Sequence, residues 1–204
     1  METLIEELPE IITSLGVIIV GFFTYNQYTR NKRTDYELEK LKLSDKVKNK
    51  RRADASSKIW GAVHNVLSQT GADRVYIVQP HPLGNEEMLS IYYEVVRNGV
   101  EEMKPFIQKM KINRVAKFAE YLSEHLFVYI TDIDKQVDDR YARSIMSTHG
   151  TSHLIVKRLS SAENDWVGSI FCEYTKEITL TESNAKTILH RAATDIQYIL
   201  PPIE

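Results

Sequence analysis

The alternation of apolar and polar positions divides the chain into an apolar run, a polar helical stretch and a series of shorter alternating segments. The apolar run covers residues 11–29, where 19 consecutive positions carry no charged side chain. A helix rises about 1.5 Å per residue, so about 20 residues cross a hydrocarbon layer of about 30 Å. The run therefore predicts a single transmembrane helix, whose anchoring side chains are Ile11, Ile12, Leu15, Val17, Ile18, Ile19, Val20, Phe22, Phe23 and Tyr25.

Two other interpretations of this apolar run stay open. It could be a core or interfacial helix of a soluble domain, or a signal peptide that is removed. Signal peptides begin with basic residues and end at small residues. This chain has four glutamates among residues 1–10, and the run ends in Phe22-Phe23-Thr24-Tyr25. The pattern therefore favours the membrane span.

A polar stretch without glycine or proline follows at residues 28–57. It is rich in leucine, lysine, glutamate and arginine, which favour a helix. Its apolar positions are too sparse for sustained heptads, so a coiled coil is not indicated, although dimerisation along this stalk stays open. From Ala53 onward, apolar residues recur at helical spacing and predict a helix that ends near residues 69–71. Its inward side chains are predicted to be Ile59, Trp60, Val63, Val66 and Leu67.

The remaining pattern predicts one α+β domain over residues 53–204. Alternating β-branched and aromatic residues predict strands at 73–79, 88–97, 126–130, 152–159 and 166–175. Helical periodicity predicts helices at 101–124, 138–147 and 179–200. Asn98-Gly99 indicates a tight turn, and Thr179-Leu-Thr-Glu182 indicates a capping box. An antiparallel sheet with the N- and C-terminal helices packed together on one face satisfies this order.

This element order resembles the GAF fold over about residues 53–200. The resemblance also rests on the Trp166-Val-Gly168 hairpin strand and on the small helix before Ser152-His-Leu-Ile-Val. It implies a ligand pocket lined by that helix and the adjoining face of the sheet. The Asn-Lys-Phe-Asp-Glu type motif of cyclic-nucleotide GAF domains is absent, and no cysteine stands where bilin-binding members attach their chromophore. The ligand is therefore unknown, and cyclic nucleotides and bilins are disfavoured.

The charge falls into three zones, although the net charge is only −2. Residues 1–29 hold four acids and no base, residues 30–52 hold ten bases and four acids, and the rest is mildly acidic. Basic residues beside a span are retained on the cytoplasmic side. The α+β domain is therefore predicted to lie in the cytoplasm, with the span in the cell (inner) membrane. Arg30, Lys32 and Arg33 are predicted to face lipid headgroups, with a merely solvated basic face as the alternative.

The histidines and the cysteine offer little chemistry. A single cysteine, Cys172, excludes an intramolecular disulfide and a multi-cysteine metal site. Its position in a predicted strand favours a buried structural thiol over a nucleophile. His149 and His153 have the spacing of two ligands on a helix, but Gly150 interrupts that helix and no third ligand is evident.

The acidic run at residues 132–139 does not match a calcium-binding loop, which needs glycine at its sixth position and glutamate at its twelfth. It favours a helix N-terminus stabilised by Asp138 and Asp139. The chain has no glycine-rich phosphate loop, no Gly-x-Ser-x-Gly elbow and no kinase signature. We therefore predict no catalytic site, no metal, no cofactor and no enzymatic activity. The near-neutral net charge also gives no reason to expect a nucleic acid as partner.

The layout of the whole chain resembles the holin of T-even bacteriophages. The matching segments are Val75-Tyr-Ile-Val-Gln-Pro80-His-Pro-Leu83, Ile91-Tyr-Tyr-Glu-Val-Val, Asn98-Gly99-Val and a late strand with Gly168 and Cys172. The resemblance implies a periplasmic domain that receives an antiholin signal, and a span that oligomerises into membrane lesions. It conflicts with the basic residues at 30–52, here called the basic collar, which predict a cytoplasmic domain.

Two functions follow from these patterns. The first is a non-catalytic, single-pass membrane protein whose GAF-like domain serves sensing or protein interaction. Its expected partners are the lipid membrane, further copies of the chain, and a regulatory protein or small ligand at the GAF-like domain. The alternative is a phage holin that lyses the host. A scaffold that tethers an assembly through the basic stalk is a third, lesser possibility.

Overall fold

A computed structural model describes residues 27, 32, 40–44, 46–47, 50–81 and 87–201. The chain divides into two units, residues 1–51 and 52–204, which are described separately. In the first unit the described residues are helical and exposed, Lys32 among them. The predicted anchor at residues 11–25 and the predicted headgroup contacts Arg30 and Arg33 lie outside the described residues. Among the residues that are described, no helix combines the length and apolar character needed to cross a bilayer.

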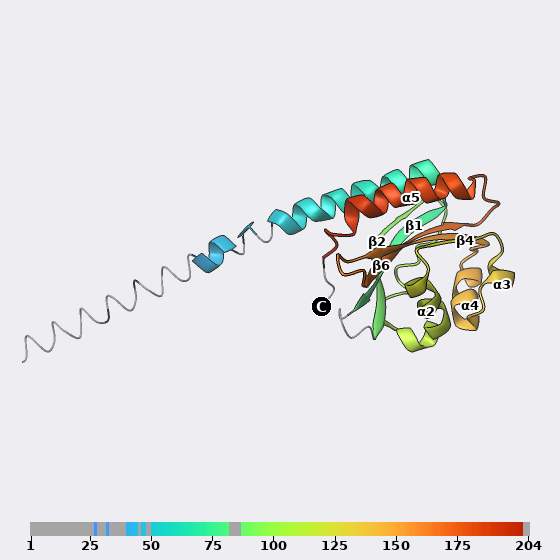
Figure 1. Cartoon of the computed structure of the whole chain (residues 1–204), viewed down its shortest axis with the longest axis horizontal. Helices are drawn as coiled ribbons and strands as arrows, with labels where there is room; N and C mark the ends of the chain where they lie inside the picture. Colours follow the sequence, from blue (N-terminus) through green and yellow to red (C-terminus); the bar gives the residue numbers. More distant parts are fainter. Residues whose placement is uncertain are drawn as a thin grey trace, which may run out of the picture. The chain divides into compact units, whose positions relative to one another are not determined.

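The second unit is an α+β domain built around a six-stranded antiparallel sheet, as predicted (Figure 1). The strand order is β3-β2-β1-β6-β5-β4. The strands are β1 (Arg74–His81), β2 (Met88–Val96), β3 (Met110–Lys111), β4 (Phe127–Ile130), β5 (His153–Ser160) and β6 (Trp166–Tyr174). A helix that ends at residue 70 comes first, followed by the 3-10 helix η1 (Ile112–Val115) and helices α2 (Ala116–Glu124), α3 (Ile133–Gln136), α4 (Arg140–Thr148) and α5 (Glu182–Ile196).

Helices cover both faces of the sheet (Figure 1). On one face, the helix over residues 52–70 lies beside α5, and Ile59 of the first and Leu189 of the second belong to one buried cluster. On the other face, Phe118 of α2 and Met146 of α4 belong to a second buried cluster. The predicted packing of the N- and C-terminal helices on one face is therefore confirmed.

Strand β1 shows how the sequence produces these two layers. Successive side chains of a strand point to opposite faces of a sheet. Val75 and Ile77 accordingly belong to the cluster under α5, whereas Tyr76 and Val78 belong to the cluster under α2 and α4. Because β1 lies in the interior of the sheet, with a neighbour on each side and helices over both faces, its described residues are all buried.

The prediction of a helix over residues 101–124 is wrong in its first half. Residues 101–109 are irregular, and helical structure begins only with η1 and α2. Pro105 has no backbone N–H to donate to a helical turn, and Lys109 has a φ of 49°, which is incompatible with a right-handed helix. Phe106, an apolar residue within the predicted helix, is 43% exposed.

The edge of the sheet explains where this segment goes instead. The carboxylate of Glu94 on β2 accepts hydrogen bonds from the backbone N–H groups of Met103 (2.6 Å) and Lys104 (2.7 Å). Further along, the short strand β3 pairs with β2, an element that the sequence pattern does not reveal. Asn98-Gly99 does form the predicted turn, with Gly99 at a φ of 84°.

Strand β1 is longer than predicted. It continues through Pro80, which lies opposite Leu89 of β2, to His81, where the sequence predicts a loop. Proline cannot donate to a strand ladder and is tolerated where no partner needs its N–H. The pairing of β1 with β6 ends at Val78 and Ser169, so no residue of β6 pairs with Pro80 or needs a hydrogen bond from its backbone nitrogen.

Two further predictions are corrected near the N- and C-terminal helices of the domain. The N-cap of α5 is Thr181, whose side chain accepts a hydrogen bond from the N–H of Asn184, and not the predicted Thr179. Leu180, just before the cap, packs against the core, and the helix ends at residue 196 rather than 200. Trp60 is 37% exposed and therefore does not face fully inward as predicted. Its ring packs edge-on against that of Tyr93, with a centroid distance of 5.3 Å.

Candidate functional site

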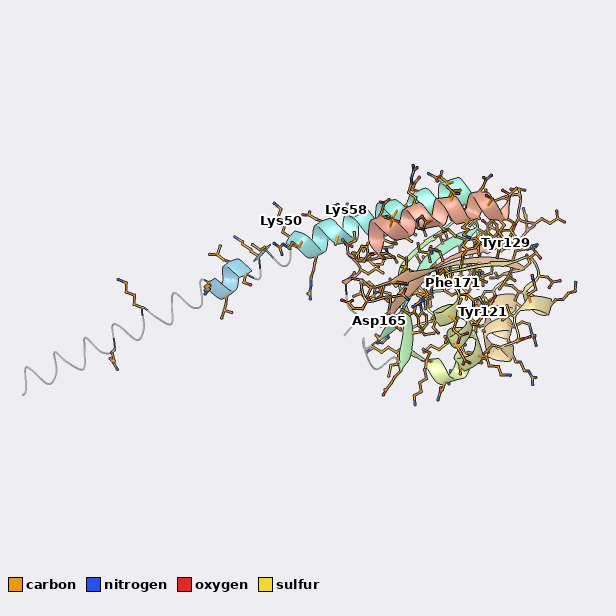
Figure 2. The ribbon with its side chains drawn as sticks, in the orientation of Figure 1. Lys50, Lys58, Tyr121, Tyr129, Asp165 and Phe171 are labelled. Atoms are coloured by element: carbon orange, nitrogen blue, oxygen red, sulfur yellow. The ribbon has the colours of Figure 1, made fainter. Side chains whose placement is uncertain are left out.

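The face of the sheet that packs against α2 and α4 is where the resemblance implies a ligand pocket. Side chains at alternate positions of β1 and β6 face Leu122 of α2 and Met146 of α4 across this layer. Phe171 of β6, labelled in Figure 2, is buried in it. Its ring stacks on Tyr76, with the ring centroids 5.0 Å apart. The implied pocket thus corresponds to a layer lined by aliphatic, aromatic and methionine side chains.

This layer holds little free space. The void in it measures about 40 Å³, and its accessible wall is apolar. A buried water needs roughly 10–15 Å³ in the same measure, whereas pockets for drug-sized ligands measure about 300–1,000 Å³. The space between the sheet and helices α2 and α4 is filled by side chains that include Trp166, Phe171 and Met110. In this conformation the domain's own side chains occupy the place of a ligand.

A buried ion pair lies on the same face of the sheet. Nε of Arg74 on β1 donates to Oε2 of Glu173 on β6 at 2.7 Å, and both side chains are fully buried. The remaining guanidinium nitrogens donate to the carbonyl oxygens of Glu101 (2.9 Å) and His149 (3.0 Å) and to the hydroxyl of Thr151 (2.5 Å). The pair therefore ties two sheet strands to the loop after β2 and to the turn after α4.

The carboxylate of Glu173 also organises two hydroxyl groups. The phenol of Tyr76 donates to Oε1 at 2.5 Å, and the hydroxyl of Thr151 donates to Oε2 at 2.8 Å. Burial raises the pKa of Tyr76, and the nearby Glu173 charge raises it further. Because its pKa is raised in the folded state, the Tyr76 phenol contributes to the free energy of unfolding. This contribution is complete below about pH 10 and is lost as the pH rises beyond it. The phenol is therefore a neutral donor at physiological pH.

The charged groups of this network are engaged with one another. The carboxylate accepts three hydrogen bonds, and the guanidinium donates to four acceptor atoms. A general acid or base must reach a substrate atom within about 2.6–3.2 Å. Here the groups contact each other with no space between them, so the arrangement is that of a structural clamp.

Sequence reasoning missed this clamp, although a signal exists. Arg74 stands two residues before Tyr76, and Glu173 stands two residues after Phe171. In both strands a charge therefore lies on the same face as a buried aromatic ring. Two opposite charges in that pattern on two strands indicate a buried pair, because an unpaired charge in an apolar layer is strongly disfavoured.

The residues that the sequence analysis singled out lie apart from one another. Cys172 is buried in β6, and burial raises the pKa of its thiol, which fits a structural role. Nδ1 of His149 lies 2.9 Å from a carboxylate oxygen of Glu101, whereas Nδ1 of His153 lies 2.8 Å from the hydroxyl of Ser152. Among the described residues, no three potential metal ligands come together.

Two acidic residues after β4 cap helices, and the sequence indicates one of them, Asp139. Asp132 accepts a hydrogen bond from the N–H of Lys135 at the start of α3. Asp139 accepts from the N–H groups of Tyr141 and Ala142 at the start of α4, both at 3.0 Å. Asp138, predicted to share this role, is exposed and does not cap the helix.

No protein-family model matches the sequence, and no curated protein matches it either. Solved structures do match. The GAF3 domain of Slr1393 from Synechocystis sp. PCC6803, in its photoproduct state, is 12% identical, with a TM-score of 0.58 over 70% of this chain and 90% of that one. The PixJ GAF domain of Thermosynechococcus elongatus, in its blue-light-absorbing form, is 11% identical, with a TM-score of 0.58 over 72% and 87%. The phycocyanobilin-bound GAF domain of a cyanobacterial phytochrome is 14% identical, with a TM-score of 0.55 over 73% and 93%.

At such low identity these similarities concern the fold alone. They support the GAF-like fold that the element order predicts. They cover about three quarters of the chain or less in these three cases, so they concern the domain rather than the layout of the whole chain. The function has to be argued from this chain's own residues.

Proposed function

We propose that the chain is a membrane-anchored, non-catalytic protein whose GAF-like domain serves sensing or protein interaction. The observation that carries the proposal is the packed layer between the sheet and helices α2 and α4, with its void of about 40 Å³. The buried pair of Arg74 and Glu173, on the same face of the sheet, is satisfied within the protein. A domain whose interior is filled in this way binds through its surface, so protein interaction is the form that we favour.

The position of the cysteine argues against a covalently attached bilin, the type of group that is bound in one of the similar structures. Cys172 belongs to the cluster under α5, on the opposite face of the sheet from the packed layer. Ile170 lies on that same face, two residues before it. A tetrapyrrole in the packed layer would therefore have no thiol to attach to, in addition to having no room.

We expect that neither phycocyanobilin nor cyclic GMP changes the melting temperature of the purified full chain. The physical reason is the small apolar void, which offers neither volume nor polar partners. Scanning fluorimetry with each compound measures this directly. Saturation at about a hundred times the dissociation constant would add about 2.7 kcal/mol of stability. A saturable rise of that size would contradict the proposal, because it would mean that the layer opens for a ligand.

The anchoring part of the proposal rests on the sequence pattern. Residues 11–29 are uncharged, and residues 30–52 carry ten basic side chains against four acidic ones. Such a collar attracts anionic headgroups by about 1 kcal/mol for each lysine or arginine near the surface. The proposed location is the inner membrane, with the GAF-like domain in the cytoplasm and with further copies of the chain as partners.

We expect a cytoplasmic C-terminus. A reporter that is active only in the cytoplasm, fused after Glu204, should be active, and an exported reporter at the same place should not be. Changing Arg30, Lys32 and Arg33 to glutamate should reduce the cytoplasmic signal, because basic residues beside the span determine its orientation. The matched control changes Lys58 to glutamate, since this residue lies well beyond the predicted collar. An exported C-terminus in the unchanged chain would overturn the proposed topology.

A phage holin is the second candidate, and the resemblance of the whole-chain layout favours it. This candidate requires the C-terminus outside the cytoplasm, so the same reporters separate the two functions. An exported C-terminus together with rapid loss of membrane potential on expression would support the holin. Growth of cells that contain well-inserted protein would count against it.

A further inference from the structure

A furrow crosses the surface on the helix side of the domain, between α2 and the start of α4. It consists of two adjoining hollows of about 390 Å³ and 200 Å³. Both hollows are lined by Lys117, Asp138 and Asp139, which makes them one continuous feature. The buried Phe118 lines both the smaller hollow and the packed layer, so the furrow borders that layer.

The floor of the furrow is held by Asp139. Its carboxylate accepts hydrogen bonds from the N–H groups of Tyr141 and Ala142 at the start of α4, and from the N–H of Phe118 near the start of α2 at 3.4 Å. The positive ends of two helices therefore converge on this one charge. The Asp139 carboxylate keeps its negative charge, which these backbone donors stabilise and which counts against the surrounding basic side chains.

Basic side chains dominate the walls of the furrow. Arg114 and Lys117 project from η1 and α2, Arg140 projects from α4, and all three are exposed. Asp138 is the exposed acid among the lining residues. The larger hollow has three cations against Asp138 and Asp139, a net formal charge of +1, whereas the smaller hollow has Lys117 alone against the same two acids. An acidic group is therefore favoured in the larger hollow.

Each hollow also presents a tyrosine. Tyr141 lines the larger hollow and Tyr121 the smaller one, and each residue is 40% exposed. Arg114 lies 5.7 Å from the ring centre of Tyr141, and its Nη1 donates to the phenol oxygen at 3.3 Å. Tyrosine and arginine are the residue types that most often dominate the binding energy of protein interfaces. The Arg114–Tyr141 pair is moreover already ordered, which reduces the entropy that binding must overcome.

We propose that this furrow is the docking surface for an acidic, extended segment of a protein partner. The proposal rests on the proposed interaction role and specifies the chemistry of the partner. A lone small anion would occupy one hollow near the basic groups. An extended segment can place carboxylates against Arg114, Lys117 and Arg140 while its other side chains cover Tyr121 and Tyr141. The two adjoining hollows and their separate tyrosines therefore favour the segment.

The test uses the full chain in uncharged phosphatidylcholine nanodiscs and a display library of random linear peptides. Peptides selected on the unchanged chain are expected to be enriched in aspartate and glutamate over the starting library. Their affinity should fall at least about tenfold with Lys117→Glu, because reversal places like charges together. Lys186→Glu is the matched control, an identical charge change on the exposed side of α5, and it should leave the affinity unchanged. Melting temperatures check that both variants fold.

The other outcomes separate the two proposals. Selected peptides without acidic enrichment, or peptides that bind both variants equally, would overturn the furrow as docking surface and leave an interaction role elsewhere on the domain. Failure to select any peptide would count against the interaction role itself. Binding of inorganic pyrophosphate that Lys117→Glu abolishes, without peptide binding, would overturn the segment in favour of a small anion. Binding to anionic vesicles that Lys117→Glu abolishes and Lys186→Glu does not, without peptide binding, would assign the furrow to lipid.

Discussion

Replacing Arg74 by methionine is expected to lower the free energy of unfolding by about 3–5 kcal/mol. Methionine keeps an unbranched apolar stem but removes the charge, so the fully buried Glu173 loses the ion pair at 2.7 Å. An uncompensated charge in an apolar layer costs far more than the ion pair itself contributes. The carbonyl oxygens of Glu101 and His149 also lose their donors. Both loops held by the clamp should therefore loosen together with the sheet.

Chemical denaturation of the full chain, followed by circular dichroism, measures this loss. The matched control is Lys135→Met, which breaks an ion pair with Asp132 whose lysine side chain is 83% exposed, and no measurable change is expected there. The double variant Arg74→Met, Glu173→Leu should recover part of the stability, because removal of both charges leaves neither unpaired. Wild-type stability in the single variant would refute the clamp.

The strands and the two layers could be predicted from the sequence because their signals are local. The alternation of Val75, Tyr76, Ile77 and Val78 already assigns each side chain to a face, and the sheet preserves that assignment. The segment at residues 101–109 could not be predicted in this way. Its composition suits a helix, but the carboxylate of Glu94, on the preceding strand β2, accepts hydrogen bonds from its backbone N–H groups, and such contacts override local propensity.

The candidate sites were harder to predict than the fold because they depend on register and on side-chain volume. Arg74 and Glu173 meet because β1 and β6 pair with these two residues opposite each other. No local pattern specifies that register. The filled layer likewise depends on the sizes of Trp166 and Phe171 against two helices that come earlier in the chain. By contrast, the place of Asp139 at a helix N-terminus follows from its neighbours alone, and the structure confirms it as the N-cap of α4.

Replacing Phe171 by alanine is expected to cost about 3–5 kcal/mol of unfolding free energy and to open a cavity of aromatic size. Phe171 is only 4% exposed, and its ring stacks on Tyr76 and meets the edge of Phe118 at a centroid distance of 6.4 Å. The void of about 40 Å³ already adjoins it. Removal of the ring joins the volume of the ring to that void.

Benzene is expected to raise the melting temperature of the Phe171→Ala chain and to leave that of the unchanged chain alone, because apolar cavities of about 150 Å³ stay dry and bind benzene. Phe106→Ala is the matched control, since it removes the same ring from a position that is 43% exposed and should produce neither effect. Loss of stability without benzene binding would mean that α2 and α4 collapse onto the sheet, and a sensing role through this layer would then be untenable. Benzene binding would mean that the Phe171 side chain alone separates the packed layer from a ligand pocket.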